Sequence, residues 1–274
     1  MASVRSTPRV DAPDVRTPGR RRASAAADRP RMPKANPWPG RPGAWPTHCP
    51  LCFGALEPLP GAGGYARHRS ARCSAQCVLT TRQYQPDELA IRGSRDAQVA
   101  ARHRERFLTQ WTRHYTLMRR ACPALTIERF IAVIACVDVA DLWSYRMLRD
   151  DDLAAVLLAL AGFLRVPDMP TDAPTDTLAP TVRWVRFWFD ASVRDVGDLW
   201  AAGADAPRLF RVDYREPLVT PYPTGAQVHA WQPVDGMRDA WARQADANEP
   251  AVDVADRAAF ARFLARPSAS GAGA

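Results

Sequence analysis

The 274-residue sequence lacks the features that would send it into or across a membrane. It has no run of about 18 apolar residues, which a membrane-spanning helix needs. Its longest apolar stretch, Leu153 to Leu164, predicts a buried helix instead. The first residues are rich in arginine and proline without an apolar core, so no secretory signal is expected. Asp11, Asp14 and Asp28 argue against a mitochondrial transit peptide, which is poor in acidic residues, and we therefore expect a cytoplasmic protein.

The sequence also lacks the short motifs of the commonest enzyme chemistries. It contains no G-x-x-x-x-G-K-[ST], no G-x-G-x-x-G, no G-x-S-x-G and no H-E-x-x-H. Acidic residues gather in one loop of the second half, at Asp190, Asp195 and Asp198, where such residues usually form turns and caps. We predict no catalytic residue, and the lowest-ranked alternative is an enzyme of unknown class that uses Asp195 or Asp198.

Lysine is almost absent, since Lys34 is the only one, and arginine carries nearly all of the positive charge. The formal net charge is +8, but it is unevenly distributed. Residues 1–125 contain 22 Lys and Arg against 8 Asp and Glu, a balance of +14, whereas residues 126–274 contain 15 against 21, a balance of −6. A basic half joined to an acidic half predicts a polyanionic partner for the first half.

Four of the six cysteines form two close pairs, Cys49 with Cys52 and Cys73 with Cys77, in the pattern C-x2-C-x20-C-x3-C. His68 lies just before the second pair. An even number of cysteines can indicate a disulfide framework, but that interpretation suits short secreted chains. In a cytoplasmic protein the two close pairs favour a metal site, and unligated buried cysteines are the alternative.

Zinc binds four thiolate or imidazole ligands in a tetrahedron. One ligand set is Cys49, Cys52, Cys73 and Cys77; a mixed set replaces Cys77 with His68. The all-cysteine set is slightly favoured because both pairs are closely spaced, and because Cys73 and Cys77 would share one face of a helical turn. His68 would then not bind the metal itself. It would either contact one of the metal-binding residues or face a phosphate. Either set fills all four positions, so the predicted zinc is structural.

The cysteine segment is similar to the small zinc-ribbon and treble-clef-like knuckles of many nucleic-acid-associated proteins. It also resembles the amino-terminal cysteine segment of CoiA-like competence proteins, in which a C-P-x-C knuckle precedes an aromatic-and-His stretch and a further cysteine. The matching positions are Cys49 to Cys52, Tyr65 to His68, and Cys73. Tyr65 to His68 departs from the His-x-x-His form, and no nuclease-like Asp/Glu-x-Lys cluster follows.

The order of patterns predicts an α+β fold with an N-terminal zinc knuckle, a helical middle, and a small antiparallel sheet with C-terminal helices. The predicted segments are a disordered arm (1–43), the zinc-binding knuckle (44–85), a helical region (86–165), an α+β region (166–266) and a disordered tail (267–274).

Periodicity and capping residues predict the individual elements. Helices are expected from Ser94, with Asp96 in the first turn, to Cys122; from Thr126; and from 150–152 through Phe163, up to Pro167. Strands are predicted over 182–189, 209–214 and 226–234, and short helices over 236–247 and 252–264.

The arginines predict the function. Three lie around His68, and three more lie on the long helix, where they could contact phosphate oxygens: Arg67, Arg69, Arg72, Arg102, Arg106 and Arg113. We predict a zinc-containing accessory protein that binds DNA or RNA non-specifically through its basic half. The alternative is an adaptor in which zinc staples a docking surface and the arginines face an acidic protein partner.

Overall fold

The protein has an α+β fold, as the sequence predicts. The computed structural model describes residues 47–59, 66–81, 96–167, 182–201, 206–242 and 252–265. Strands β1 and β2 form one antiparallel sheet, and β3-β4-β5-β6 form a second, in that order. The strands are β1 (Leu56–Pro58), β2 (Ala66–His68), β3 (Leu164–Pro167), β4 (Val182–Phe189), β5 (Leu209–Tyr214) and β6 (Val228–Pro233). The helices are α1 (Ala71–Gln76), α2 (Ala97–Ala121), α3 (Ile127–Val139), α4 (Asp150–Leu160), α5 (Met237–Ala242) and α6 (Val254–Leu264).

Two of the predicted segments, the arm over 1–43 and the tail over 267–274, lie outside the described residues. No helix among the described residues is both long enough and apolar enough to cross a bilayer.

Capping side chains decide where the helices begin. α2 starts after Asp96, whose carboxylate accepts a 3.1 Å hydrogen bond from the backbone of the first turn. The prediction that Ser94 caps this helix is therefore wrong, because Asp96 already satisfies a free N–H there and its negative charge suits a helix N-terminus. Thr126 caps α3 as predicted, and α2 ends at Ala121, with Cys122 as its C-terminal cap just before Pro123.

The segment after α4 differs from the prediction. The helix ends at Leu160 and does not continue through Phe163. Gly162 has a φ of +64°, a left-handed conformation that favours glycine and terminates helices. The chain then forms β3, an edge strand that pairs with β4 and ends at Pro167. Proline is tolerated there because an edge position needs no N–H donor.

Each face of the four-stranded sheet has its own core, because alternate side chains of a strand point to opposite faces. Val185 and Phe187 of β4 belong to a core built mainly by α2, α3 and α4, which we call the helical core. Trp184 of β4 and Phe210 of β5 belong to the other core, the outer core. There they pack with residues of the N-terminal described segments, such as Leu79.

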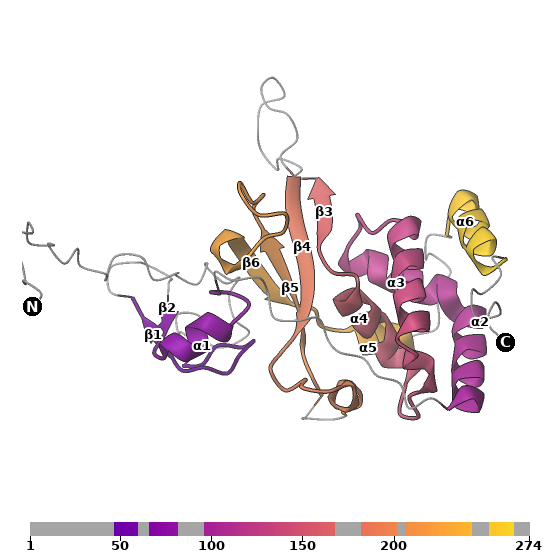
Figure 1. Cartoon of the computed structure of the whole chain (residues 1–274), viewed down its shortest axis with the longest axis horizontal. Coiled ribbons are helices and arrows are strands. Elements are labelled where there is room, and N and C mark those ends of the chain that lie inside the picture. The colour runs from indigo at the N-terminus through magenta and orange to yellow at the C-terminus, as the bar shows by residue number, and fades with distance from the viewer. Residues whose placement is uncertain are drawn as a thin grey trace, which may run out of the picture.

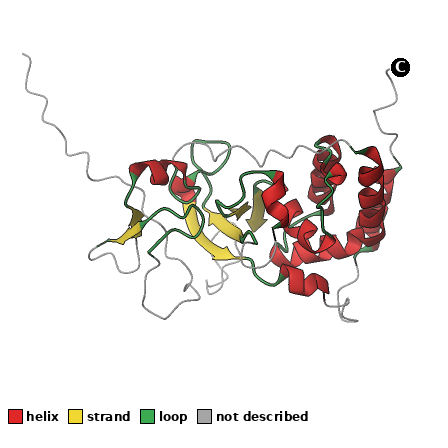
Figure 2. Ribbon diagram, turned by 90° about the horizontal axis from the view of Figure 1, so that it is seen from below, coloured by secondary structure: helices red, strands yellow, loops and turns green. Residues whose placement is uncertain are grey.

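We call residues 47–59 and 66–81 the knuckle module. Its β1 and β2 pair antiparallel, and α1 follows directly. Figures 1 and 2 show the module on one side of the large sheet and helices α2, α3, α4 and α6 on the other. The module contributes about half of the buried residues of the outer core: Cys49, Leu51, Leu56, Ala66, Cys77 and Leu79.

Close backbone contacts join the knuckle module to the sheet. The N–H of Gly225, in the turn before β6, donates to the carbonyl of Thr81 at 2.7 Å. A Cβ on Gly225 would lie 2.5 Å from that carbonyl oxygen, so only glycine allows this approach. The N–H of Ala191, after β4, donates to the carbonyl of Leu51 at 2.7 Å. The module is therefore held at both of its ends.

Candidate metal centre

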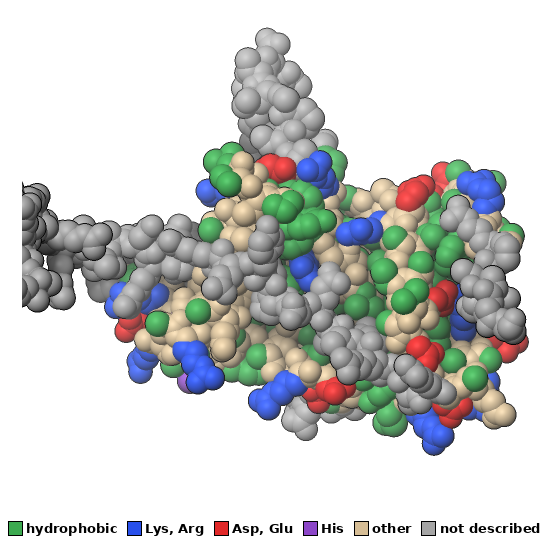
Figure 3. All heavy atoms as spheres, viewed as in Figure 1, with side chains coloured by type: hydrophobic (Ala, Val, Ile, Leu, Met, Phe, Trp, Pro, Cys, Tyr) green, Lys and Arg blue, Asp and Glu red, His purple; other side chains and the backbone are tan. Residues whose placement is uncertain are grey.

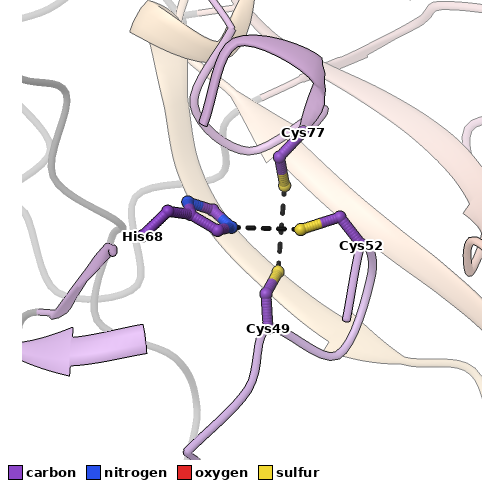
Figure 4. Close-up of side chains that lie close together, drawn as sticks. All are labelled: Cys49, Cys52, His68 and Cys77. Carbon is purple, nitrogen blue, oxygen red and sulfur yellow. Dashed lines mark hydrogen bonds between the residues drawn. The ribbon is translucent and has the colours of Figure 1, made fainter. Parts of the chain in front are cut away.

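Three cysteines and one histidine of the knuckle module point toward one another (Figure 4). The ligand atoms of Cys49, Cys52, His68 and Cys77 all lie within 4.8 Å of one another. The Sγ atoms of Cys49 and Cys77 are 3.8 Å apart, and the Sγ of Cys52 is 3.1 Å from Nε2 of His68. Cys49, His68 and Cys77 are buried, and Cys52 is half-buried. These four residues lie close enough to bind a metal ion.

A tight turn supplies the first two cysteines. The N–H of Cys49 donates to the carbonyl of Gly54 at 2.9 Å, and the N–H of Phe53 donates to the carbonyl of Cys49 at 2.8 Å. The N–H of Gly54 points to the Sγ of Cys52 at 3.4 Å. These bonds fold C-P-L-C-F-G back on itself, so that both sulfurs face the same side.

Strand β2 supplies the histidine. Ala66 and His68 face inward and are buried, while Arg67 between them faces outward and forms an ion pair with Glu57 of β1. Because alternate side chains of a strand point to opposite faces, His68 is buried in the cluster while Arg67 lies on the surface. The Nε2 atom of His68 faces the sulfurs, and its Nδ1 has no partner among the described residues.

The end of α1 selects which cysteine of the second pair joins the cluster. Ser70 caps α1, and the helix stops at Gln76. Cys77 is the C-terminal cap with an extended backbone, φ −79° and ψ 130°, so Cys73 and Cys77 do not share a helical face. Cys77 is brought into the cluster and Cys73 is not. The set seen here thus combines His68 with Cys77, whereas both ligand sets weighed from the sequence contained Cys73.

Cys73 nevertheless lies nearby, across Gly54. A Cβ built on Gly54 would lie 2.9 Å from Cβ of Cys73, 3.0 Å from Cδ2 of His68 and 3.3 Å from Sγ of Cys52. Glycine is required there because the turn passes between the α1 helix and the histidine ring.

Hydrogen bonds inside the cluster favour one thiolate. Bonds from Cys49 and Cys77 lower the pKa of Cys52. The bond to Cys52 raises the pKa of Cys49 to about 12, with burial adding to the effect. Bonds to Cys49 and Cys52, together with burial, raise the pKa of Cys77. A divalent cation at the centre of the cluster would favour the ionised form of all three sulfurs.

The spacing of the sulfurs fits tetrahedral coordination. Metal–sulfur bonds of about 2.3 Å place tetrahedral sulfurs about 3.8 Å apart, which is the separation of the Cys49 and Cys77 sulfurs. A disulfide would need about 2.05 Å, and all six cysteines are free thiols. The donor set, three sulfurs and one imidazole nitrogen, is one that structural metal sites use.

The structure separates the six predicted arginines into two groups. Arg67, Arg69 and Arg72 lie on the knuckle module, whereas Arg102, Arg106 and Arg113 lie on α2, on the opposite side of the large sheet (Figure 1). The predicted arginines of the basic first half therefore lie on two separate surfaces rather than one.

Several of these arginines have partners inside the protein. Arg106 forms an ion pair with Asp150 at 2.7 Å. The guanidinium of Arg113 lies 4.2 Å from the ring centre of Trp241 and donates to its carbonyl. Arg69, Arg72 and Arg102 are exposed, and no acidic side chain of the described segments pairs with any of them.

The acidic residues considered for catalysis form caps. Asp195 caps the short 3₁₀ turn over 196–200, where its side chain accepts from the N–H of Gly197 at 3.4 Å. The carboxylate of Asp198 accepts hydrogen bonds from the N–H groups of Arg194 and Asp195, at 2.8 and 3.0 Å. The two side chains are thus committed to the local backbone, the ordinary use of such residues in loops.

Comparison of the chain with family models, with curated proteins and with solved structures found no match. The ligand cluster and the surface around it are therefore the features that point to a function.

Proposed function

We propose that the knuckle module holds one structural zinc ion through Cys49, Cys52, His68 and Cys77. The convergence of these four ligand atoms within 4.8 Å carries the proposal. Thiolate and imidazole ligands favour zinc among the common divalent ions. With four protein ligands no position is left for water or substrate, so the ion would stabilise the fold and not act in catalysis. Free thiols suit a reducing compartment such as the cytoplasm.

Elemental analysis of the purified protein tests the zinc proposal. We expect one zinc per chain in the wild type and almost none in Cys77→Ser. Cys73→Ser is a matched control, because it makes the same change near the same helix but outside the cluster, and it should retain its zinc. Loss of zinc from both variants alike, or a wild type that takes up no zinc from excess, would contradict the proposed ligand set.

We further propose that the module binds DNA or RNA non-specifically, through Arg69 and Arg72. Both side chains are exposed, and neither pairs with an acidic side chain of the described segments. Figure 3 shows basic side chains on the surface of the module. Arginines on a rigid support contact phosphates without reading base sequence, and such binding weakens as salt rises because counterions are released.

A salt titration of binding distinguishes binding at Arg69 and Arg72 from an effect of the overall positive charge of the protein. Arg69→Glu/Arg72→Glu should lower the affinity for a mixed-sequence oligonucleotide and reduce the slope of log K against log salt by about 2. Arg102→Glu/Arg119→Glu changes the net charge equally on α2 and should have a smaller effect. Equal effects of the two pairs would show that the module is not the binding surface, and a wild type that does not bind would reject nucleic-acid binding.

A protein–protein adaptor is the second candidate function. The loop between β5 and β6 presents Leu218 and Val219, which are 97% and 94% exposed. The same loop runs into Gly225, which is bonded to Thr81 of the knuckle module. In this candidate function, a metal-stapled module would support an apolar docking tip. Pull-downs with nuclease treatment test it: an identified partner should persist with the wild type and be lost from Leu218→Asp/Val219→Asp.

A further inference from the structure

Phe53 combines two features that folding alone disfavours. Its φ is +57°, in the left-handed region where a side chain is strained and glycine is preferred. The residue as a whole is 52% exposed. Phe53 does not belong to the outer core, although Leu51 belongs to it and Cys52 packs against it. A strained, exposed residue that the core does not require indicates a role at the surface.

The metal-binding turn holds Phe53 in place. Its N–H donates to the carbonyl of Cys49 at 2.8 Å, and the adjacent Gly54 is bonded to Cys49 and Cys52. Fixing the two cysteines on one ion would therefore also fix the backbone that carries the ring. A ring that is held in place before binding loses little conformational entropy when a ligand packs on it.

The two exposed arginines of the module lie on the segments that border this turn. The carbonyl of Ala55, two residues after Phe53, accepts a 2.8 Å hydrogen bond from the N–H of Arg69. Gly54 packs against Cys73, the residue that follows Arg72. One aromatic ring and two cationic side chains therefore come from adjoining backbone segments of one small surface.

We propose that Phe53 is a base-stacking residue and that the knuckle module binds unpaired bases in single-stranded nucleic acid. This inference rests on the proposed binding of nucleic acid and adds the class of substrate. An aromatic side chain stacks on the face of any base while arginines contact the backbone phosphates. In a duplex the faces of each base are covered by the neighbouring pairs. Stacking on Phe53 is therefore expected with an unpaired base, whose face is free. The arginines favour this polyanion over an apolar pocket of a protein.

Binding of a labelled single-stranded oligonucleotide and of the matching duplex tests the inference with the full-length, zinc-loaded protein. Phe53→Ala should lower the single-strand affinity by about 5- to 150-fold, and the duplex affinity by less than about twofold. Phe53→Trp should retain the single-strand affinity. The wild type should quench 2-aminopurine in the oligonucleotide, and Phe53→Ala should not. Zinc content equal to that of the wild type shows that each variant has folded.

The outcomes separate the stacking role from the proposed function. If Arg69→Glu/Arg72→Glu abolishes binding while Phe53→Ala binds both oligonucleotides like the wild type, stacking is overturned and nucleic-acid binding stands. Equal losses on single strand and duplex would also overturn the preference for unpaired bases. If the wild type binds neither, the proposed function itself fails, and Phe53 faces some other partner such as a protein.

Discussion

The two faces of the large sheet are covered in different ways. On one face, 29 buried side chains of the described residues form the helical core, including Phe107, Phe130 and Phe260. On the other face, the outer core has 11 buried side chains, six of them from the knuckle module. Two of those six, Cys49 and Cys77, belong to the ligand cluster. A core this small needs a further constraint, and four ligands around one bound ion would provide it.

The two faces of the large sheet therefore differ in what stabilises them: apolar burial by helices on one face, and a small core with a ligand cluster on the other. Long amphipathic helices bury enough apolar surface to stabilise their side without further help. The knuckle module has short strands and a six-residue helix, and such elements are marginal when they are not held together. The outer core should therefore depend on the metal, whereas the helical core should not.

Removal of the metal should have the largest effect of any change, and the loss of structure should be confined to the knuckle module and the outer core. We expect a chelator to remove amide protection from Leu56, Arg69 and Thr81, whose N–H groups form hydrogen bonds within the module, because zinc binding contributes about 10–16 kcal/mol in small zinc domains. Protection of Ile134 and Val137 in α3 should remain. Hydrogen exchange measured by mass spectrometry checks this, and uniform loss over both sides would show that the two cores are one cooperative unit.

Truncation of a side chain in the helical core should destabilise the helical side of the sheet and leave the metal site intact. Phe130→Ala should lower the free energy of unfolding by about 3–5 kcal/mol, since Phe130 is fully buried among aromatic rings. Zinc content should not change. Leu79→Ala is the counterpart in the outer core and should lower zinc affinity instead. Denaturant unfolding with zinc measurement tests both, and a Phe130→Ala protein that loses zinc would contradict the separation.

A side chain added where the module meets the sheet should destabilise the protein. Gly225→Ala should lower the free energy of unfolding by about 3 kcal/mol, the upper end of the range for overpacking, because the added Cβ meets the backbone of Thr81. Gly197→Ala is a control whose Cβ meets only the hydroxyl of Tyr145, at 3.0 Å. Thermal unfolding of the zinc-loaded proteins compares them. Equal stability of the two variants would show that the joint tolerates a side chain.

Acid should destabilise the helical core through one residue. His114 is fully buried between Phe107 and Trp241, and neither ring nitrogen has a partner among the described residues. Burial lowers the pKa of His114 to about 3 from 6.5, with Arg113 and Arg106 adding to the shift. The unfolded chain therefore takes up the proton first, and stability falls as the pH drops from 6.5 toward 3, by about 2 kcal/mol at pH 5.

Replacing that histidine should remove this pH dependence. His114→Phe keeps the stacking and should unfold with a smaller slope of stability against pH over this range. Trp111→Phe changes an aromatic residue of the same helix that does not titrate, and it should keep the wild-type slope. Chemical unfolding at pH 5 and pH 7 measures both, and an unchanged slope in His114→Phe would contradict the assignment.

Most elements of the fold could be predicted from local patterns. The α3 cap at Thr126 and strands β4 and β5 agree with the prediction, because periodicity and capping are local properties. β3 was missed because a four-residue edge strand depends on a partner strand far along the chain. The start of α2 was misplaced because two residues that can cap a helix, Ser94 and Asp96, lie two positions apart.

The five candidate ligands could be read from their spacing, but the group of four could not. The spacing of Cys73 and Cys77 suggests that they share a helical face, and only the end of α1 at Gln76 turns Cys77 away from that face. The outward, strained position of Phe53 likewise left no mark in the pattern of the sequence. A φ value depends on the hydrogen bonds of the whole turn.

The sequence alone determined which residue types are available: two close cysteine pairs, a histidine, helices with their caps, and the excess of arginine in the first half. Tertiary structure decided which of them meet. It placed His68 with Cys77 because a strand and a helix end converge there, and it put the module arginines and those of α2 on opposite sides of a sheet. The physical reason is that composition and spacing act along the chain, whereas a ligand cluster or a charged surface requires segments to converge in space.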